Sequence, residues 1–292
     1  MSEDGLAQAR AMLDELLDAA RKGAIIPIRL PGQIEEIRAA LEPKQEDSVA
    51  AKSGDGGDLD GFKKDFAGLL SHGFHDLRLP LTSIRGYSDM LGTPGMGDLN
   101  PMQQQFLATV RVNSRRLESL LMDVSDLSKI YLGTLKTTAK MDMFKNIGMM
   151  VEKAMRTTAE DLGRTLTLDI PSGLPILNVD AEILAKALNK LVENSLRYMP
   201  PEGGEVRLGA SGDGSTLNIV IQDNGIGMTP EELAKLGTPF FRGDNEIILA
   251  HKGSGLGAPI AFSLIQLLGG TVNVASELGQ GTTVTISLPG MS

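Results

Sequence analysis

The chain has 292 residues, a formal net charge of −9 and no cysteine. This length suits two domains, and the hydrophobic content of 41% is ordinary for a globular protein. The negative charge argues against nucleic-acid binding and against attraction to anionic lipid, and the lack of cysteine excludes disulfides and thiol chemistry. We find neither a run apolar enough for membrane insertion nor a signal-peptide pattern, so we expect a cytoplasmic protein.

Four regions follow one another along the chain. Residues 1–42 are expected to form a small helical N-terminal segment of unknown role, and residues 43–60, rich in Ser, Gly and Asp, are typical of a flexible linker. Residues 61–134 predict a helical hairpin, whereas residues 135–292 alternate helices with strands and predict an α/β sandwich. The expected fold class is therefore multidomain α+β.

Two amphipathic helices build the expected hairpin, over about residues 60–92 and 101–131. Their apolar residues recur at three- and four-residue steps, and a stretch rich in Gly and Pro separates them. Asn100 suits the cap of the second helix, because its side chain can accept a hydrogen bond from the first turn. One hairpin has too few neighbours to bury both apolar faces, so we expect a homodimer with a four-helix bundle.

His75 is expected on the solvent-exposed face of the first helix, opposite its apolar stripe. Much of a histidine population is neutral at pH 7, so one ring nitrogen can act as a nucleophile while the adjacent Asp76 holds the other as N–H. Pro80 cannot donate to the carbonyl of Asp76, which predicts a kink or a loosened turn. Taken alone, the His-Asp pair is also compatible with an ordinary solvated helix face.

Two glycine-containing patterns in the C-terminal region are compatible with nucleotide binding. The strand 217–223 alternates apolar residues so that Asp223 lies on the core side, where an adenine amine would be a fitting partner for the carboxylate. Residues 253–257, Gly-Ser-Gly-Leu-Gly, open an apolar helix whose backbone N–H groups can approach a phosphate. Either pattern alone is weak, because Asp-x-Gly turns and glycine triplets are common.

The helix 181–198 carries a polar stripe beside its apolar face, formed by Lys190, Asn194, Arg197 and Tyr198. Asn194 offers a neutral oxygen to Mg²⁺, which accepts few protein ligands, and Arg197 can reach a phosphate. By itself this stripe is also compatible with a solvated helix face.

In their order and spacing these motifs resemble the sensor histidine kinases of two-component signalling. Residues 75–81, His-Asp-Leu-Arg-Leu-Pro-Leu, resemble the H box of that family. The other resemblances are residues 191–198 to the N box, 223–227 and 253–257 to the two glycine boxes, 239–242 to the F box, and 279–283 to the last glycine turn. The resemblance covers about residues 61–290.

The resemblance implies a dimerisation and histidine phosphotransfer domain over 61–134 and a catalytic, Bergerat-type ATP-binding domain over 135–292. It implies that ATP phosphorylates His75, with Asp76 as the base or orienting group, and that a response-regulator receiver domain accepts the phosphoryl group. The implied ligands are ATP and Mg²⁺, with Asn194 as the metal ligand. The implied ATP-binding residues are Lys190, Asn194, Arg197, Tyr198, Asp223, Gly225, Gly227, Gly253, Gly255, Leu256, Gly257 and Thr283. Residues 228–252 would form a mobile lid.

Three positions depart from the family pattern. Leu79 stands four residues after His75, where the family usually has Thr or Asn, so we expect weak or absent phosphatase activity towards a phosphorylated partner. Lys190 stands where the family often has Asn, and it could contact phosphate instead or lower the dependence on magnesium. Pro259 follows the second glycine box and suits a first helical turn, so the site should survive.

Two further functions stay open at this point. One is a dimeric scaffold that senses nucleotide and has lost phosphotransfer, against which the intact His75, Asp76 and Asn194 argue. The other is a Bergerat-fold ATPase. Glu193 is not in the helical position that a water-activating base would require, and an ATPase would leave the hairpin histidine unexplained.

Overall fold

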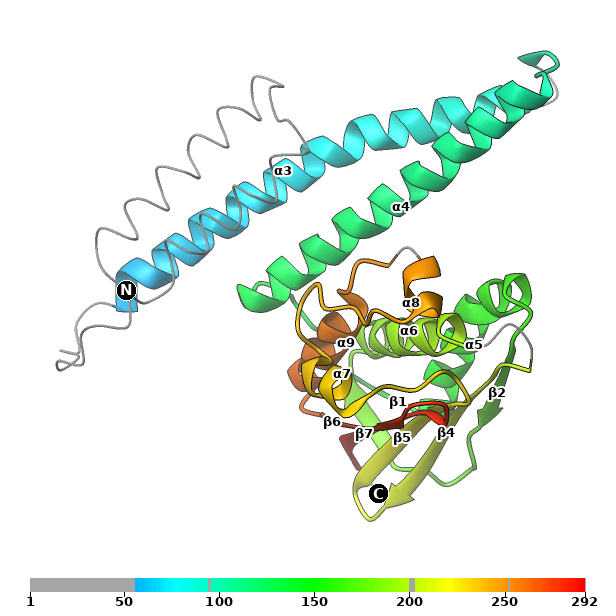
Figure 1. The fold of residues 1–292 in the computed structure, drawn as a ribbon. Helices are drawn as coiled ribbons and strands as arrows, with labels where there is room; N and C mark the ends of the chain where they lie inside the picture. Colours follow the sequence, from blue (N-terminus) through cyan, green and yellow to red (C-terminus); the bar gives the residue numbers. More distant parts are fainter. Residues whose placement is uncertain (1–55, 94–95, 200–202, 252, 292) are drawn as a thin grey trace. The chain divides into compact units, whose positions relative to one another are not determined.

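The computed structural model describes residues 56–93, 96–199, 203–251 and 253–291 (Figure 1). The expected N-terminal segment, residues 1–42, and most of the expected linker lie outside these ranges. The linker was predicted to reach residue 60, but helix α3 already begins at Gly56. A composition rich in Ser, Gly and Asp is typical of a linker but does not exclude a helix.

Two long helices form the predicted hairpin: α3 spans Gly56–Leu91 and α4 spans Pro101–Tyr131. The start of α4 is fixed by a capping box, in which Asn100 and Gln103 each accept a hydrogen bond from the other's backbone N–H. Helix α3 continues through Pro80, so the proline removes one hydrogen bond without ending the helix.

Ion pairs join the two helices of the hairpin, whereas most of its apolar side chains stay uncovered. Arg85 of α3 lies 2.7 Å from Glu118 of α4, and Arg111 of α4 lies 3.1 Å from Asp89 of α3. Leu81 is buried. Large apolar side chains that remain exposed on the two helices include Leu77, Ile84, Met90, Leu91, Phe106, Val110, Val112 and Leu117.

The C-terminal region is built on a seven-stranded sheet with the order β1-β3-β7-β5-β4-β2, in which β6 also pairs with β7. Strands β2 and β4 run parallel, and all the other recorded pairs are antiparallel. The strands β1 to β7 span Lys140–Asp142, Thr165–Asp169, Ile176–Val179, Glu205–Asp213, Thr216–Asp223, Thr271–Glu277 and Gly281–Met291.

Three helices form the layer that packs on this sheet: α5 (Phe144–Asp161), α6 (Ala181–Arg197) and α9 (Gly257–Leu267) (Figure 1). Helix α6 is central, because it contacts α5 and α9 as well as β4 and β5. The core lies between this layer and the sheet: Leu188 of α6 and Ile219 and Ile221 of β5 have no exposed surface. The predicted α/β sandwich following a helical hairpin is confirmed.

Two short helices, α7 (Pro230–Lys235) and α8 (Glu246–Ala250), lie in the long connection between β5 and α9. Within the described ranges, none of the helices combines the length and the apolar character needed to cross a bilayer.

Candidate nucleotide-binding site

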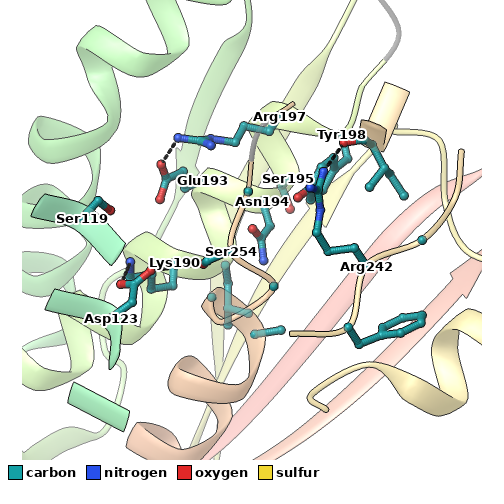
Figure 2. A pocket seen from close by; sticks show the side chains of 18 of the residues that line it. Ser119, Asp123, Lys190, Glu193, Asn194, Ser195, Arg197, Tyr198, Arg242 and Ser254 are labelled. Carbon is teal, nitrogen blue, oxygen red and sulfur yellow. Dashed lines mark hydrogen bonds and ion pairs between the residues drawn. The ribbon is translucent and has the colours of Figure 1, made fainter. Parts of the chain in front are cut away.

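A cavity of about 800 Å³ opens beside α6, where β5 ends and α9 begins. Figure 2 shows its polar side chains, which come from α4, α6 and the connection between β5 and α9. Among the residues named from the sequence, those that line the cavity are Lys190, Asn194, Arg197, Tyr198, Asp223, Gly227, Gly253, Gly255 and Gly257. The structure therefore brings Lys190 and Gly257, 67 positions apart in the chain, to the same cavity.

Asp223 anchors one end of the cavity. Its Oδ2 accepts a hydrogen bond from the Ser195 hydroxyl at 2.7 Å, and its Oδ1 accepts from the N–H groups of Gly225 and Thr282, both at 3.0 Å. Burial raises the pKa of Asp223, and these three hydrogen bonds oppose the rise. Three fixed donors orient the carboxylate, which can accept a further hydrogen bond from a ligand amine.

The sequence missed two partners of this carboxylate. Ser195 lies on the buried face of α6, and nothing in its own segment points to a strand end 28 residues away. The structure brings Thr282, and not the predicted Thr283, to Asp223. In the β5–β7 register Thr282 pairs with Asp223 and Thr283 with Gln222, so side-chain alternation turns Thr283 to the opposite face.

The first glycine box forms the wall behind Asp223. A side chain at Gly225 would place its Cβ 2.6 Å from the carbonyl oxygen of Tyr198, so the position tolerates only glycine without a shift of the backbone. Gly225 itself does not line the cavity, whereas Gly227 does. Gly227 has φ +64°, and a Cβ there would overlap the carbonyl group of Glu277.

The second glycine box forms the opposite wall and leads into α9. Gly255 adopts φ +70°, and a Cβ there would lie 2.7 Å from the backbone of Phe240 and Phe241. Leu256, predicted among the ATP-binding residues, is fully buried and belongs to the core, so it anchors the loop instead of lining the cavity. Gly257 opens α9, and a Cβ built there would be 3.5 Å from the side-chain oxygen of Asn194.

Cationic groups surround the glycine-lined part of the cavity. Lys190 and Arg197 come from α6, and Arg242 comes from the connection before α8. Arg197 pairs with Glu193 at 2.5 Å, whereas Arg242 donates to the carbonyls of Ile248 and His251, each at 2.5 Å. Arg242 belongs to the F box but is not among the predicted site residues, because its contacts depend on how the connection folds back.

Tyr198, which lines the cavity, packs against the ring of His251, which does not line it. Their ring centroids are 6.2 Å apart in an edge-to-face arrangement. Desolvation lowers the pKa of His251, and the nearby positive charges of Arg197, Arg164 and Arg242 lower it further. A ring kept neutral in this way adds no positive charge to a cluster that already holds several arginines.

The site suits a divalent cation that travels with a phosphate ligand. Within the described part of the chain there is no group of three or more His, Cys, Asp or Glu side chains able to hold a metal on its own. The amide of Asn194 lies next to the start of α9, where phosphates would approach backbone N–H groups. A single protein oxygen combined with phosphate oxygens is a typical Mg²⁺ environment.

His75 and Asp76 lie on the solvent-exposed part of α3, as the sequence predicted. Their side chains are 68% and 79% exposed, and His75 Nδ1 is 3.5 Å from Asp76 Oδ1. Neither residue lines the cavity. The carboxylate lies on the Nδ1 side of the ring, so Nε2 is the nitrogen left free to react.

These features define a class: a nucleotide-binding α/β domain joined to a helical hairpin that exposes a histidine with an adjacent carboxylate. Comparison with known families agrees with both parts. Residues 67–133 match the His Kinase A (phospho-acceptor) domain, and residues 179–291 match the histidine kinase-, DNA gyrase B- and HSP90-like ATPase domain. The chain belongs to the two-component sensor histidine kinases.

Individual relatives support this membership. The chain is 30% identical over 223 residues to the histidine protein kinase DivJ of Caulobacter vibrioides, covering 76% of this chain and 37% of DivJ. It is 28% identical to the sensor protein SrrB of Staphylococcus aureus, covering 79% of this chain and 39% of SrrB. The crystal structure of full-length ShkA in complex with AMPPNP superposes with a TM-score of 0.66 at 25% identity, covering 77% of this chain and 46% of ShkA. The chain thus spans less than half the length of these proteins.

Proposed function

We propose that the chain uses ATP to phosphorylate His75 and then passes the phosphoryl group to an aspartate of a response-regulator receiver domain. The observation that carries the proposal is the Asp223 carboxylate, held by three donors at one end of a glycine-walled cavity, in a chain that also exposes the His75–Asp76 pair. A fixed acceptor suits an adenine amine, and a glycine-walled helix start suits phosphates.

In this proposal different residues of the cavity contact different parts of the nucleotide. Asp223 accepts from the adenine amine, with Gly225 and Gly227 shaping the wall around it, and Tyr198 lines the nucleotide. Asn194 contributes an oxygen to Mg²⁺ beside the phosphates. Lys190, Arg197 and Arg242 supply positive charge, and residues 228–252 act as the lid.

The chemical step follows from the exposed histidine. The lone pair of His75 Nε2 attacks the γ-phosphorus, a nitrogen–phosphorus bond forms, and the bond to the oxygen bridging the β- and γ-phosphates breaks, so that ADP leaves. Asp76 keeps the proton on Nδ1 and orients the ring. The transfer depends mainly on positioning and charge neutralisation, so the approach of the two domains should control its rate.

The domain boundaries and the assembly belong to the same proposal. Residues 61–134 form the dimerisation and phosphotransfer domain, and residues 135–292 form the catalytic domain. A homodimer would bury the apolar side chains of α3 and α4 in a four-helix bundle.

Incubation with γ-labelled ATP tests the proposal against its two alternatives. The kinase predicts protein-bound label that is acid-labile and base-stable, and that disappears in His75→Gln but not in the matched variant His72→Gln, which changes the other histidine of α3. Release of free phosphate without bound label would favour an ATPase, and nucleotide binding with neither outcome would favour a scaffold.

Leu79 carries a second part of the proposal. Its side chain is 59% exposed and has no polar atom that could position a water. We therefore expect this chain to remove phosphate from a phosphorylated receiver domain weakly or not at all. Rapid loss of the receiver's phosphate on addition of the protein with ADP would contradict this expectation.

A further inference from the structure

Three side chains from different segments meet at the edge of the cavity: Asp123 of α4, Lys190 of α6 and Ser254 of the second glycine box (Figure 2). Lys190 Nζ donates to Asp123 Oδ1 at 2.5 Å, and the Ser254 hydroxyl donates to Asp123 Oδ2 at 3.4 Å. Asp123 is only 6% exposed. We call these three residues the Asp123 cluster.

In the Asp123 cluster the carboxylate of Asp123 accepts hydrogen bonds from two donors that a phosphate could also use, Lys190 and Ser254. Lys190 lies one turn before Asn194 on α6, and Ser254 lies between two glycines of the box that leads into α9. The carboxylate carries negative charge and accepts the same kinds of hydrogen bond as a phosphate oxygen. Two anions competing for one lysine in a partly buried site also repel each other.

A second ion pair lies near the first on the same two helices. Lys186 of α6 is 2.5 Å from Asp126 of α4. Neither of these residues lines the cavity, in contrast to Asp123 and Lys190. Both pairs join α4 to α6, but only the first puts a negative charge where the phosphates of a nucleotide would lie.

We propose that Asp123 is a built-in competitor of the nucleotide's phosphates and so sets the affinity of the cavity for phosphorylated ligands. In the structure its carboxylate accepts hydrogen bonds from Lys190 and Ser254 and so joins α4 to α6. A bound nucleotide takes over both donors and releases α4. The two effects are linked: displacement of α4 from the cavity raises nucleotide affinity, and nucleotide binding favours that displacement by the same factor. This inference rests on the proposed nucleotide site.

Calorimetric titration of the full chain with Mg²⁺ and a non-hydrolysable ATP analogue tests the proposal. Asp123→Asn removes the competing charge with little change in size, and we expect it to tighten binding about 5- to 150-fold, the range typical of coupled equilibria. Asp126→Asn is the matched control, because it removes the neighbouring ion pair without changing the charge inside the cavity. Its effect should be several-fold smaller.

Two further titrations identify the phosphates as the group with which Asp123 competes. Adenosine, which has no phosphate, should bind wild type and Asp123→Asn equally. In a Lys190→Gln background the effect of Asp123→Asn should shrink, because the donor for which the two anions compete is gone. Asp123→Ser provides a second neutral variant in case the first does not fold.

Each other outcome overturns the proposal. Equal or weaker binding of the analogue by both neutral variants would exclude competition by Asp123. Equal tightening by the Asp126 variant, or a parallel gain in adenosine affinity, would assign the effect to general docking of α4. If no protein bound any of these ligands, the proposed nucleotide site itself would fail as well.

Discussion

The helical hairpin and the C-terminal domain differ in how far their apolar side chains are buried. In the C-terminal domain, residues such as Leu188 and Ile221 have no exposed surface, whereas Ile84 and Leu117 of the hairpin are 48% and 49% exposed. The domain closes its own core between a sheet and three helices, while the hairpin leaves an apolar face that a second hairpin would cover. The same chain therefore combines a domain with a closed core and a hairpin whose exposed apolar face the proposed homodimer would bury.

The largest expected effect is on association. Replacing both Ile84 and Leu117 by lysine places charges on the apolar face of the hairpin, and burying unpaired charges in a bundle costs several kcal/mol. We expect the double variant to be monomeric in light scattering, while nucleotide affinity stays within a few-fold of wild type. Leu278→Lys, at a similarly exposed position in the C-terminal domain, is the control and should leave the mass unchanged. A dimeric double variant would contradict the contrast between the two regions.

The next effect concerns the closed core. Leu188→Ala removes a fully buried side chain at the centre of α6, and such truncations destabilise by about 2–5 kcal/mol. We expect urea unfolding to show this loss, and nucleotide binding to weaken because α6 also carries Asn194. A truncation of the half-exposed Leu117 should change the unfolding of an isolated monomer far less. Comparable losses for both variants would mean that the hairpin is as well packed as the domain.

The third effect isolates ligand recognition from stability. Asp223→Asn replaces one of the two acceptor oxygens by an NH₂ donor. This donor would face either the N–H groups of Gly225 and Thr282 or the amine of the ligand, and two donors cannot form a hydrogen bond. Loss of a charged hydrogen bond of this kind is worth about 1.5–3 kcal/mol, or roughly 10- to 150-fold in affinity for adenine nucleotides. Calorimetry with ADP measures the loss. Ser195→Ala, which removes only one donor to the carboxylate, should have a smaller effect.

The raised pKa of Asp223 gives this carboxylate two pH effects of opposite sign. The folded state takes up the proton at a higher pH than the unfolded state, whose value is near 3.8. Acidification towards that value therefore stabilises the empty domain through this group. The protonated carboxyl is a weaker acceptor, so the same acidification should weaken nucleotide binding, and Asp223→Asn should abolish both dependences.

The hairpin was predicted closely because its signals are local. The bounds of α4 follow from Asn100, Pro101 and a regular apolar period, all of which can be counted along one segment. Gly227 and Gly255 of the two glycine boxes adopt positive φ, a conformation that favours glycine and that therefore leaves a mark in the sequence.

What the sequence could not provide depends on contacts between distant segments. The choice of Thr282 over Thr283 is set by the register of β7 on β5, and a shift of one residue reverses it. The buried position of Leu256 and the hydrogen bond of Ser195 arise only when α6, α9 and β5 are packed together. The ion pair of Lys190 joins residues 67 positions apart, and periodicity carries no information about such a pair.

The smallest expected effect lies in the proposed lid, residues 228–252, and distinguishes this segment from the buried core. The pKa of His251 is lowered from 6.5 by desolvation and by three neighbouring arginines, so the folded lid resists protonation more than the unfolded chain does. The stabilisation that His251 contributes is therefore present above pH 6.5 and is lost progressively as the pH falls below that value. Limited proteolysis within residues 228–252 should accelerate on acidification in wild type and much less in His251→Gln. His75→Gln, which changes an exposed histidine outside the lid, should behave as wild type, and an equal response of all three proteins would show that the lid does not sense this group.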